Sequence, residues 1–313
     1  MTVSLASSDR SAAAESPDMP VRAGVARDAS DRIFNAMTVD VEDFFQVQAF
    51  AGCVERSSWD TLPRRVEANT DKALALFSDA GITATFFTLG WIAERHPALI
   101  RRIVAQGHEL ASHGYAHIPV HQQEPRQFGE DVRITKKLLE DIGGSPVRGY
   151  RAASFSIGAK TLWAFDILAA EGYQYSSSIY PIVHDLYGMP SAPRFAYRPH
   201  RDSFLEVPMT TMSLLGRNFP CSGGGYFRLL PYALSRWALR RVNSHDRQPG
   251  IFYFHPWELD PDQPRPAGAP LKSRVRHYLN LHRMEARLAR LLSDFAWTRM
   301  DKIFLSPGGT AGS

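Results

Sequence analysis

The chain has 313 residues, of which 44% are hydrophobic and 22% charged, a composition typical of a globular protein with a sizeable core. Its formal net charge of +4 comes from scattered Lys and Arg, which argues against a nucleic-acid-binding protein. No segment reaches the roughly 18 consecutive apolar residues of a membrane span. Two cysteines, Cys53 and Cys221, are too few for a disulfide framework and lack the spacing of a zinc ribbon, so both are expected to be free thiols.

Residues 1–32 are rich in Ala, Ser and Asp, and they predict a disordered tail without a secretory signal. The expected location is therefore the cytoplasm, with membrane association through partners left open. After residue 32, strand and helix patterns alternate. The expected strands cover 33–41, 82–90, 107–114, 173–179 and 251–256, and 147–157 is expected to be a strand followed by a loop. The expected helices cover 66–81, 94–107, 124–144, 160–172 and 271–295.

Repeated strand–helix units predict a parallel sheet covered by helices, either open or closed into a barrel. In both architectures the chemistry belongs at the carboxyl ends of the strands. The last helix, 271–295, is basic and amphipathic. Packing on the sheet through its leucines is the preferred interpretation, and an anionic membrane or a partner is an alternative for its basic face.

The first expected strand ends in an acidic cluster of Asp40, Glu42 and Asp43. Three buried, ionised carboxylates would repel one another, so a metal or an arginine is expected among them. The alternative is an acid cluster at the start of a helix, where the helix dipole favours negative charge.

Further polar residues follow later strands. His113 and His117 are four residues apart, and on one face of a helical turn both imidazoles could reach one ion. Arg151 could hold an acid, and His255 is a candidate general acid. The alternatives are surface histidines, a surface arginine and a core histidine.

Five segments taken in order, TVDVED, ATFFTLG through HGYAH, RAASFSI, YQYSSSIYP and FYFHPWE, resemble the polysaccharide deacetylases with a NodB-homology domain, carbohydrate esterase family four. The resemblance covers about 34–304, and GGGYFRLLP is similar to the subgroup linked to exosortase and exopolysaccharide loci. It implies a distorted (β/α) barrel of about seven parallel strands with outer helices. The implied domain spans 33–308, with a subgroup-specific extension from about 256.

The resemblance implies a metal, zinc or else cobalt or another transition metal, held by His113, His117 and one carboxylate of the first motif. Family members usually have adjacent aspartates there, whereas here the acids are spread. Strand alternation puts Glu42 on the same side as Asp40 and favours Glu42 as the ligand, with Asp43 as the alternative.

The implied reaction is metal-dependent hydrolysis of N-acetyl groups from an amino-sugar polysaccharide, in exopolysaccharide biosynthesis. The substrate would be an acetylated polymer or a lipid-linked oligosaccharide. Asp40 would be the base, Arg151 would steady it, and His255 would protonate the leaving amine. Ala153 stands where the family usually has proline, which would loosen the turn near Arg151. Oligomeric state is not predicted.

Several aromatic residues near the motifs are candidates for substrate binding. Phe44, Phe45, Tyr226 and Trp257 would stack on sugar rings, or else pack in the core. A backbone amide near Tyr115 or Tyr150 would help to stabilise the oxyanion. The triple glycine at 223–225 is expected to be a flexible loop at the rim of the groove. Two competing functions are a cyclic-amide hydrolase similar to allantoinase and a non-catalytic glycan-binding protein.

Overall fold

The computed structural model describes residues 27–185, 187–199 and 204–305. Residues 1–26 of the expected tail and 306–308 of the expected domain lie outside these ranges. Residues 27–32 were also expected in the tail, but they form a turn. Arg27 and Ile33 make an antiparallel bridge across it, and the Asp28 carboxylate accepts hydrogen bonds from the Ser30 and Arg32 amides at 2.9 and 2.8 Å. Within the described ranges, no helix has both the length and the apolar content to cross a bilayer.

The fold is organised around strand β1 (Phe34–Val41), which is almost completely buried. It pairs in parallel with β10 at its start, β9 in its middle and β2 at its end. From β2 the sheet continues through β3, β4 and β5 to β6, again in parallel. The other strands of this sheet are β2 (Thr85–Thr88), β3 (Glu109–Ser112), β4 (Gly149–Tyr150), β5 (Tyr175–Ser176), β6 (Leu205–Glu206), β9 (Ile251–Phe254) and β10 (Ala296–Thr298).

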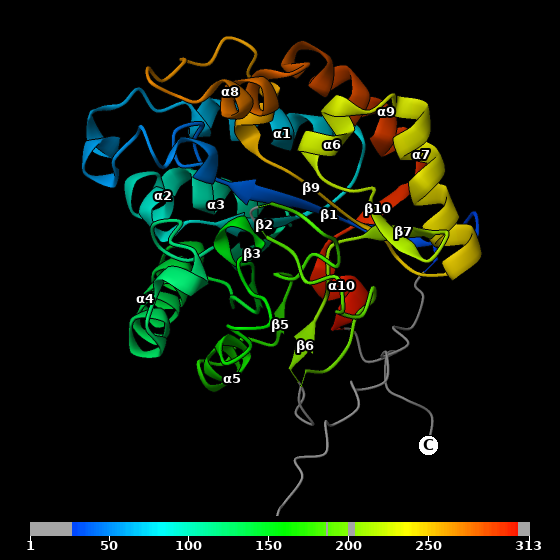
Figure 1. The fold of residues 1–313 in the computed structure, drawn as a ribbon, viewed down its shortest axis with the longest axis horizontal. Coiled ribbons are helices and arrows are strands. Elements are labelled where there is room, and N and C mark those ends of the chain that lie inside the picture. The colour runs from blue at the N-terminus through cyan, green and yellow to red at the C-terminus, as the bar shows by residue number, and fades with distance from the viewer. Residues whose placement is uncertain (1–26, 186, 200–203, 306–313) are drawn as a thin grey trace, which may run out of the picture.

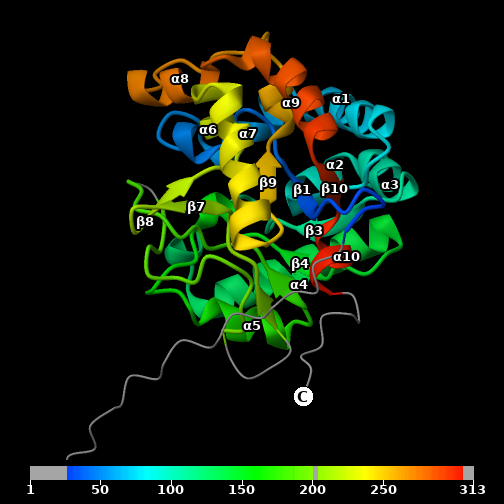
Figure 2. The same ribbon diagram turned by 90° about the vertical axis from the view of Figure 1, so that its right-hand side faces the viewer.

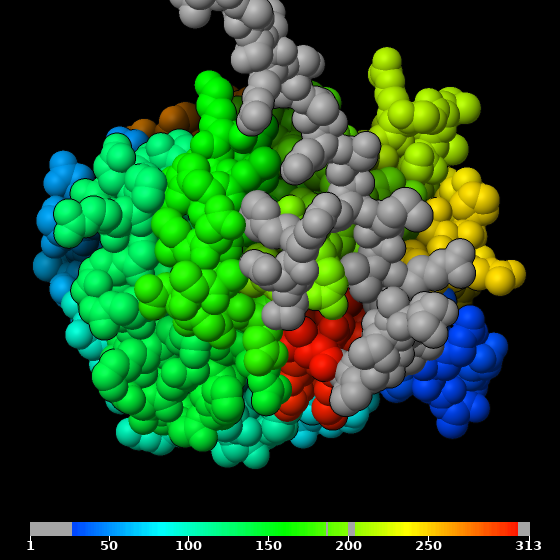
Figure 3. Space-filling view, turned by 90° about the horizontal axis from the view of Figure 1, so that it is seen from below, coloured from blue at the N-terminus to red at the C-terminus, as the bar shows by residue number. Residues whose placement is uncertain are grey.

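This eight-stranded sheet curls into a half-barrel with helices outside it, so the predicted architecture is confirmed. Figures 1 and 2 show α1 and α9 on one side of β1 and α4 and α5 on the other. Seen from below, the red C-terminal part of the chain, which contains α10, reaches the surface beside the green part (Figure 3). The helices are α1 (Val66–Asp79), α2 (Gly90–Arg95), α3 (Pro97–Ala105), α4 (Pro125–Gly143), α5 (Ala164–Ala170), α6 (Gly224–Leu229), α7 (Tyr232–Arg241), α8 (Leu271–Tyr278), α9 (Met284–Asp294) and α10 (Met300–Phe304).

Two predicted helices are each broken in two. The helix expected over 94–107 is divided between α2 and α3 at His96, because a residue that precedes proline disfavours helical backbone. The long helix over 271–295 is divided into α8 and α9, and Asn280 between them is left-handed with φ 54°. The sequence patterns also missed β6 and the antiparallel hairpin of β7 (Thr211–Leu214) and β8 (Arg217–Pro220).

A buried histidine makes the stability of the fold depend on pH. Burial lowers the pKa of His108 to about 4, and its Nδ1 accepts the Ala84 N–H at 3.0 Å. In the unfolded chain this imidazole takes up a proton near pH 6.5, so folding free energy is lost as the pH falls below that value. We expect His108 to account for about 2 kcal/mol of lost stability between pH 7 and pH 5. Urea unfolding across this range should show a shallower pH slope for His108→Gln, and an unchanged slope for the exposed control His282→Gln.

Candidate metal centre

The carboxyl ends of four strands bring the predicted site residues together. Asp40 and Glu42 come from the end of β1, and His113 and His117 follow β3. Arg151 follows β4 and His255 follows β9. Five of these six side chains line one cavity, and Arg151 lies buried behind Asp40. Asp40 and Glu42 face the same side, as strand alternation predicts.

Three of these residues form a metal-binding geometry. Ligand atoms of Glu42, His113 and His117 all lie within 4.8 Å of one another. Within the described chain, Glu42 Oε2 is buried and accepts no hydrogen bond, although it lies 3.1 Å from His117 Nε2. The His113 Nδ1–H donates to the Arg151 carbonyl at 2.8 Å, which leaves Nε2 with its lone pair available for a ligand bond. An unpaired carboxylate oxygen beside two imidazoles fits a divalent transition metal.

Burial sets the protonation of these ligands. It lowers the pKa of His113 to about 4 and that of His117 well below its usual value. Both rings are therefore neutral near pH 7, which is the form that binds a metal. Burial also raises the pKa of Glu42 to about 7. A bound cation would offset the cost of ionising this carboxylate in the interior.

The two histidines converge for a different reason from the one predicted. Residues 113–117 form a bend rather than a helical turn, with Gly114 at φ 74° and His117 at φ 51°. The Asp131 carboxylate accepts the Tyr115 amide N–H at 3.1 and 3.3 Å and holds this bend. That amide is therefore already engaged, and an amide near Tyr115 or Tyr150 that stabilises an oxyanion stays a prediction.

The position of Asp43 differs from that of Glu42. Its carboxylate accepts backbone hydrogen bonds from Phe44 at 2.8 Å, Arg65 at 2.7 Å and Val66 at 2.9 Å. Because α1 begins at Val66, Asp43 caps the start of that helix. Asp43 thus has the role given by the alternative interpretation, an acid at the start of a helix. The geometry favours Glu42, and not Asp43, as the metal ligand.

The two carboxylates should therefore respond differently to neutralisation. We expect Asp43→Asn to keep its metal and to lose about 1 kcal/mol of stability, as helix caps do. We expect Glu42→Gln to lose its metal and to remain folded. Elemental analysis of the purified variants and urea unfolding would measure both effects. Metal loss in Asp43→Asn with retention in Glu42→Gln would reverse the assignment.

Asp40 is held by the fully buried Arg151. The Arg151 Nη1 donates to Asp40 Oδ1 at 2.6 Å and to Thr38 Oγ1 at 2.9 Å, and its Nε donates to the Ser177 carbonyl at 3.1 Å. The guanidinium also lies 4.1 Å from the centre of the Phe87 ring. Arg151 is thus fixed on several sides and orients a carboxylate that lines the cavity.

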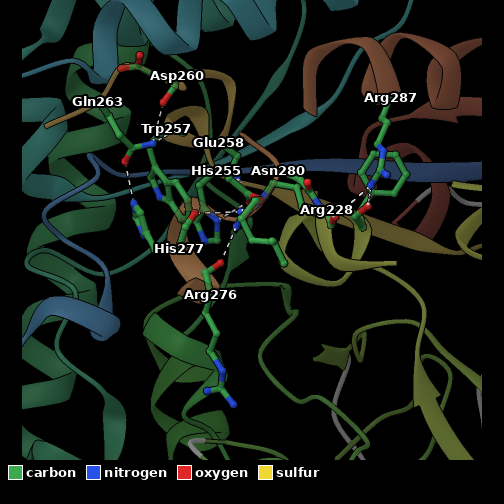
Figure 4. A network of polar contacts seen from close by, with 12 residues as sticks. Arg228, His255, Trp257, Glu258, Asp260, Gln263, Arg276, His277, Asn280 and Arg287 are labelled. Carbon is green, nitrogen blue, oxygen red and sulfur yellow. Dashed lines mark hydrogen bonds and ion pairs between the residues drawn. The ribbon is translucent and has the colours of Figure 1, made fainter. Parts of the chain in front are cut away.

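His255, which also lines the cavity, is held by a buried ion pair (Figure 4). Glu258 Oε1 accepts both the backbone N–H and the Nδ1–H of His255, at 3.1 and 2.9 Å. Its Oε2 accepts the Arg228 Nε–H at 2.6 Å. Arg228 Nη1 donates to the His277 and Leu279 carbonyls at 2.9 and 2.6 Å, which ties α6 to the end of α8. Sequence reasoning missed Glu258 and Arg228, although FHPWE and GGGYFRLLP contain them.

The charges of this network reinforce one another. Burial alone would lower the pKa of His255, but Glu42, Glu258 and Asp40 raise it to about 9. Burial would raise the pKa of Glu258, but Arg228 and His255 lower it to about 2. These carboxylates favour the protonated form of His255, whose Nε2 lies 3.5 Å from Glu42 Oε1. A proton donor thus faces the metal-binding group.

Gly223 and Gly224 are part of this packing and Gly225 lies in helix α6, so the expectation of a flexible loop is wrong. Helix α6 begins at Gly224, where an added Cβ would lie 2.1 Å from both Glu258 carboxylate oxygens. At Gly223, with φ 101°, a Cβ would lie 2.3 Å from the Tyr253 ring. Glycine is needed here because the backbone approaches both side chains closely.

Most of the aromatic candidates do not reach the cavity. Phe44 and Phe45 are buried against each other, and Tyr150 is buried against Phe128 and Tyr173, so these rings are core residues. Tyr115 and Tyr226 are partly exposed, but neither side chain lines the cavity. Trp257 does line the cavity, stacked on His255 and His277 at 5.0 and 4.0 Å. The other aromatic rings of the lining are Phe155, Tyr187 and Tyr253, which the sequence did not single out.

Comparison with known families finds two consecutive matching segments, which contain four of the six site residues. Residues 56–175 match the model of the polysaccharide deacetylase family, and residues 177–305 match a domain of unknown function, DUF3473. The chain therefore contains a segment that matches the polysaccharide deacetylase model, followed directly by one that matches DUF3473. The first match includes His113, His117 and Arg151, whereas Asp40 and Glu42 precede it and His255 lies in the second. The candidate site therefore needs both segments.

Curated relatives match short parts of the chain. A chitooligosaccharide deacetylase of Bradyrhizobium sp. (strain ANU 289) is 29% identical over 100 residues, 32% of this chain and 43% of that protein. A peptidoglycan-N-acetylglucosamine deacetylase of Bacillus cereus is 29% identical over 75 residues, 24% of this chain and 27% of that protein. The chain thus spans less than half the length of either relative.

Two solved structures share the fold. A Mycobacterium smegmatis protein named for the polysaccharide deacetylases superposes with TM-score 0.57 at 17% identity, covering 92% of this chain and 94% of that chain. Puue allantoinase superposes with TM-score 0.55 at 16% identity, covering 87% of this chain and 89% of that chain. At these identities the likeness concerns the fold alone.

Proposed function

We propose that this protein is a metal-dependent hydrolase that removes N-acetyl groups from an amino-sugar polysaccharide in exopolysaccharide biosynthesis. The observation that supports this most strongly is the Glu42–His113–His117 cluster, with Asp40 and His255 lining the same cavity. Two imidazoles and one carboxylate favour zinc. The match of residues 56–175 to the polysaccharide deacetylase model supports the substrate class, as do the printed names of the curated relatives, which refer to chitooligosaccharide and peptidoglycan.

The residues have complementary roles in this reaction. When bound, the metal would lower the pKa of water and polarise the acetyl carbonyl. Asp40, oriented by Arg151, takes the proton of the attacking water. His255, whose Nδ1–H is held by Glu258, donates a proton to the leaving sugar amine. In this proposal 33–308 is one catalytic domain. Its second segment, 177–305, supplies the general acid His255 and the Glu258–Arg228 pair that holds it.

Acetate release from acetylated chitooligosaccharides tests the proposal. We expect turnover that a chelator abolishes and that added zinc or cobalt restores. Ring opening of allantoin, measured with the same preparation, would instead favour the cyclic-amide hydrolase that shares this fold. Oligosaccharide binding with no turnover in any metal would favour the non-catalytic alternative, and either result would reject deacetylation.

A further inference from the structure

Three elements beside the cavity form one continuous surface, which we call the rim face. It consists of the β7–β8 hairpin, residues 181–185 and α8. Asn218 Nδ2 on β8 donates to the Pro181 carbonyl at 3.0 Å, and Lys272 Nζ on α8 donates to Asp185 Oδ2 at 2.6 Å. Figure 2 shows the hairpin and α8 on the same side of the molecule. Arg276 of α8 also lines the cavity, so the rim face borders its opening.

The rim face exposes large apolar side chains. Leu215, Val183 and Leu271 are 94%, 87% and 74% exposed, the highest values among the exposed large hydrophobic residues of the described chain. The remaining exposed apolar residues of these elements are Leu214, Phe219 and Val275. Exposed apolar side chains gathered in this way typically mark an interaction surface.

The tip of the hairpin carries a leucine that its own conformation disfavours. Leu214 pairs with Arg217, so the turn has two central residues, Leu215 with φ 52° and Gly216 with φ 72°. Positive φ at both positions is typical of a type I′ turn, which strongly prefers Asn-Gly or Asp-Gly. Leucine is strained at such a φ, and at 94% exposure Leu215 gains almost no packing in return. Neither turn formation nor packing in the folded chain therefore accounts for this side chain.

The same elements carry net positive charge. The exposed cations are Arg217, Lys272, Arg274 and Arg276, and the opposing acid is Asp185, so four charges less one leave +3. Apolar side chains among cations are the pattern by which peripheral proteins bind anionic bilayers.

We propose that the rim face docks on an anionic lipid surface, with Leu215, Val183 and Leu271 entering the interface and the cations contacting lipid phosphates. Docking would place the opening of the cavity next to the membrane. A substrate presented there would be a glycan attached to a lipid carrier or held at the surface, and this part of the inference rests on the proposed function. A second copy of the chain and a protein partner are the competing occupants.

Co-sedimentation of the full chain with vesicles tests the docking. We expect binding to phosphatidylcholine vesicles that contain phosphatidylglycerol, weaker binding to pure phosphatidylcholine, and weakening by salt. Leu215→Asn should reduce binding about tenfold, the effect of losing one buried leucine. Because Asn suits this turn, its melting temperature should stay the same or rise. Arg274→Gln should weaken binding to the anionic vesicles alone. The matched control is Ile134→Gln, which removes an apolar side chain that is 43% exposed on α4 and should bind like the wild type.

The outcomes separate docking from catalysis. Leu215→Asn should release acetate from a soluble chitooligosaccharide at the wild-type rate, because Leu215 does not line the cavity. Equal vesicle binding by Leu215→Asn and the wild type, or no binding by the wild type, would overturn the docking proposal. A concentration-dependent dimer that Leu215→Asn abolishes, without vesicle binding, would assign the face to a second copy and also overturn it. If the wild type binds the vesicles but releases no acetate, the result would count against deacetylation and leave the docking proposal standing.

Discussion

His113→Ala is expected to purify without its metal and to release acetate at least about a hundredfold more slowly than the wild type. The side chain is buried, and its Nδ1–H is fixed by the Arg151 carbonyl, so Nε2 is positioned before a metal arrives. Removing the imidazole leaves His117 and Glu42 as two ligands, too few for a closed or catalytic zinc site. Elemental analysis and acetate release, measured on the same preparation, test both parts.

The control is His121→Ala, which removes an exposed histidine from the segment that follows the site. It should keep the metal content and the rate of the wild type. The metal assignment would be wrong if His113→Ala kept both as well. Loss of rate with full metal content would mean that His113 acts on the substrate and is not a ligand.

Glu258→Gln is expected to lower both stability and activity. The substitution leaves the Arg228 guanidinium buried without its carboxylate, and breaking a buried pair from one side costs roughly 3–5 kcal/mol. It also removes one of the charges that raise the pKa of His255 and the acceptor of its Nδ1–H, so acetate release should fall about a hundredfold while the metal is retained. Urea unfolding, metal content and turnover would be measured together.

Replacing both partners of the ion pair separates the two effects. Arg228→Met combined with Glu258→Leu leaves no buried charge unpaired, so stability should recover much of the loss while activity stays low. An aryl acetate, whose leaving group needs little protonation, should be hydrolysed by Glu258→Gln at a nearly normal rate. The exposed control Glu130→Gln, which breaks the surface pair with Arg133, should leave stability nearly unchanged. Equal losses on the amide and the aryl ester would argue against a role through His255.

The sequence by itself determined the features that rest on local patterns. Alternating strand and helix periodicity predicted the parallel sheet, and the polar residues after its strands predicted which side chains would meet. Asp40, His113, Arg151 and His255 could be selected in this way because parallel strands bring their carboxyl ends to one rim. The preference for Glu42 over Asp43 also follows from a local rule, the alternation of side chains along a strand, and the geometry favours it.

What the tertiary structure alone decided depends on contacts between residues far apart in the chain. Asp43 caps α1 because Arg65 and Val66 fold back against it. Arg228 and Glu258 are 30 residues apart in the sequence, and no sequence periodicity predicts that they pair. Which aromatic rings face the cavity and which fill the core is likewise settled by packing, since both environments favour the same residue types. Sequence patterns report the conformation of a segment, whereas the partners of a buried side chain depend on the whole fold.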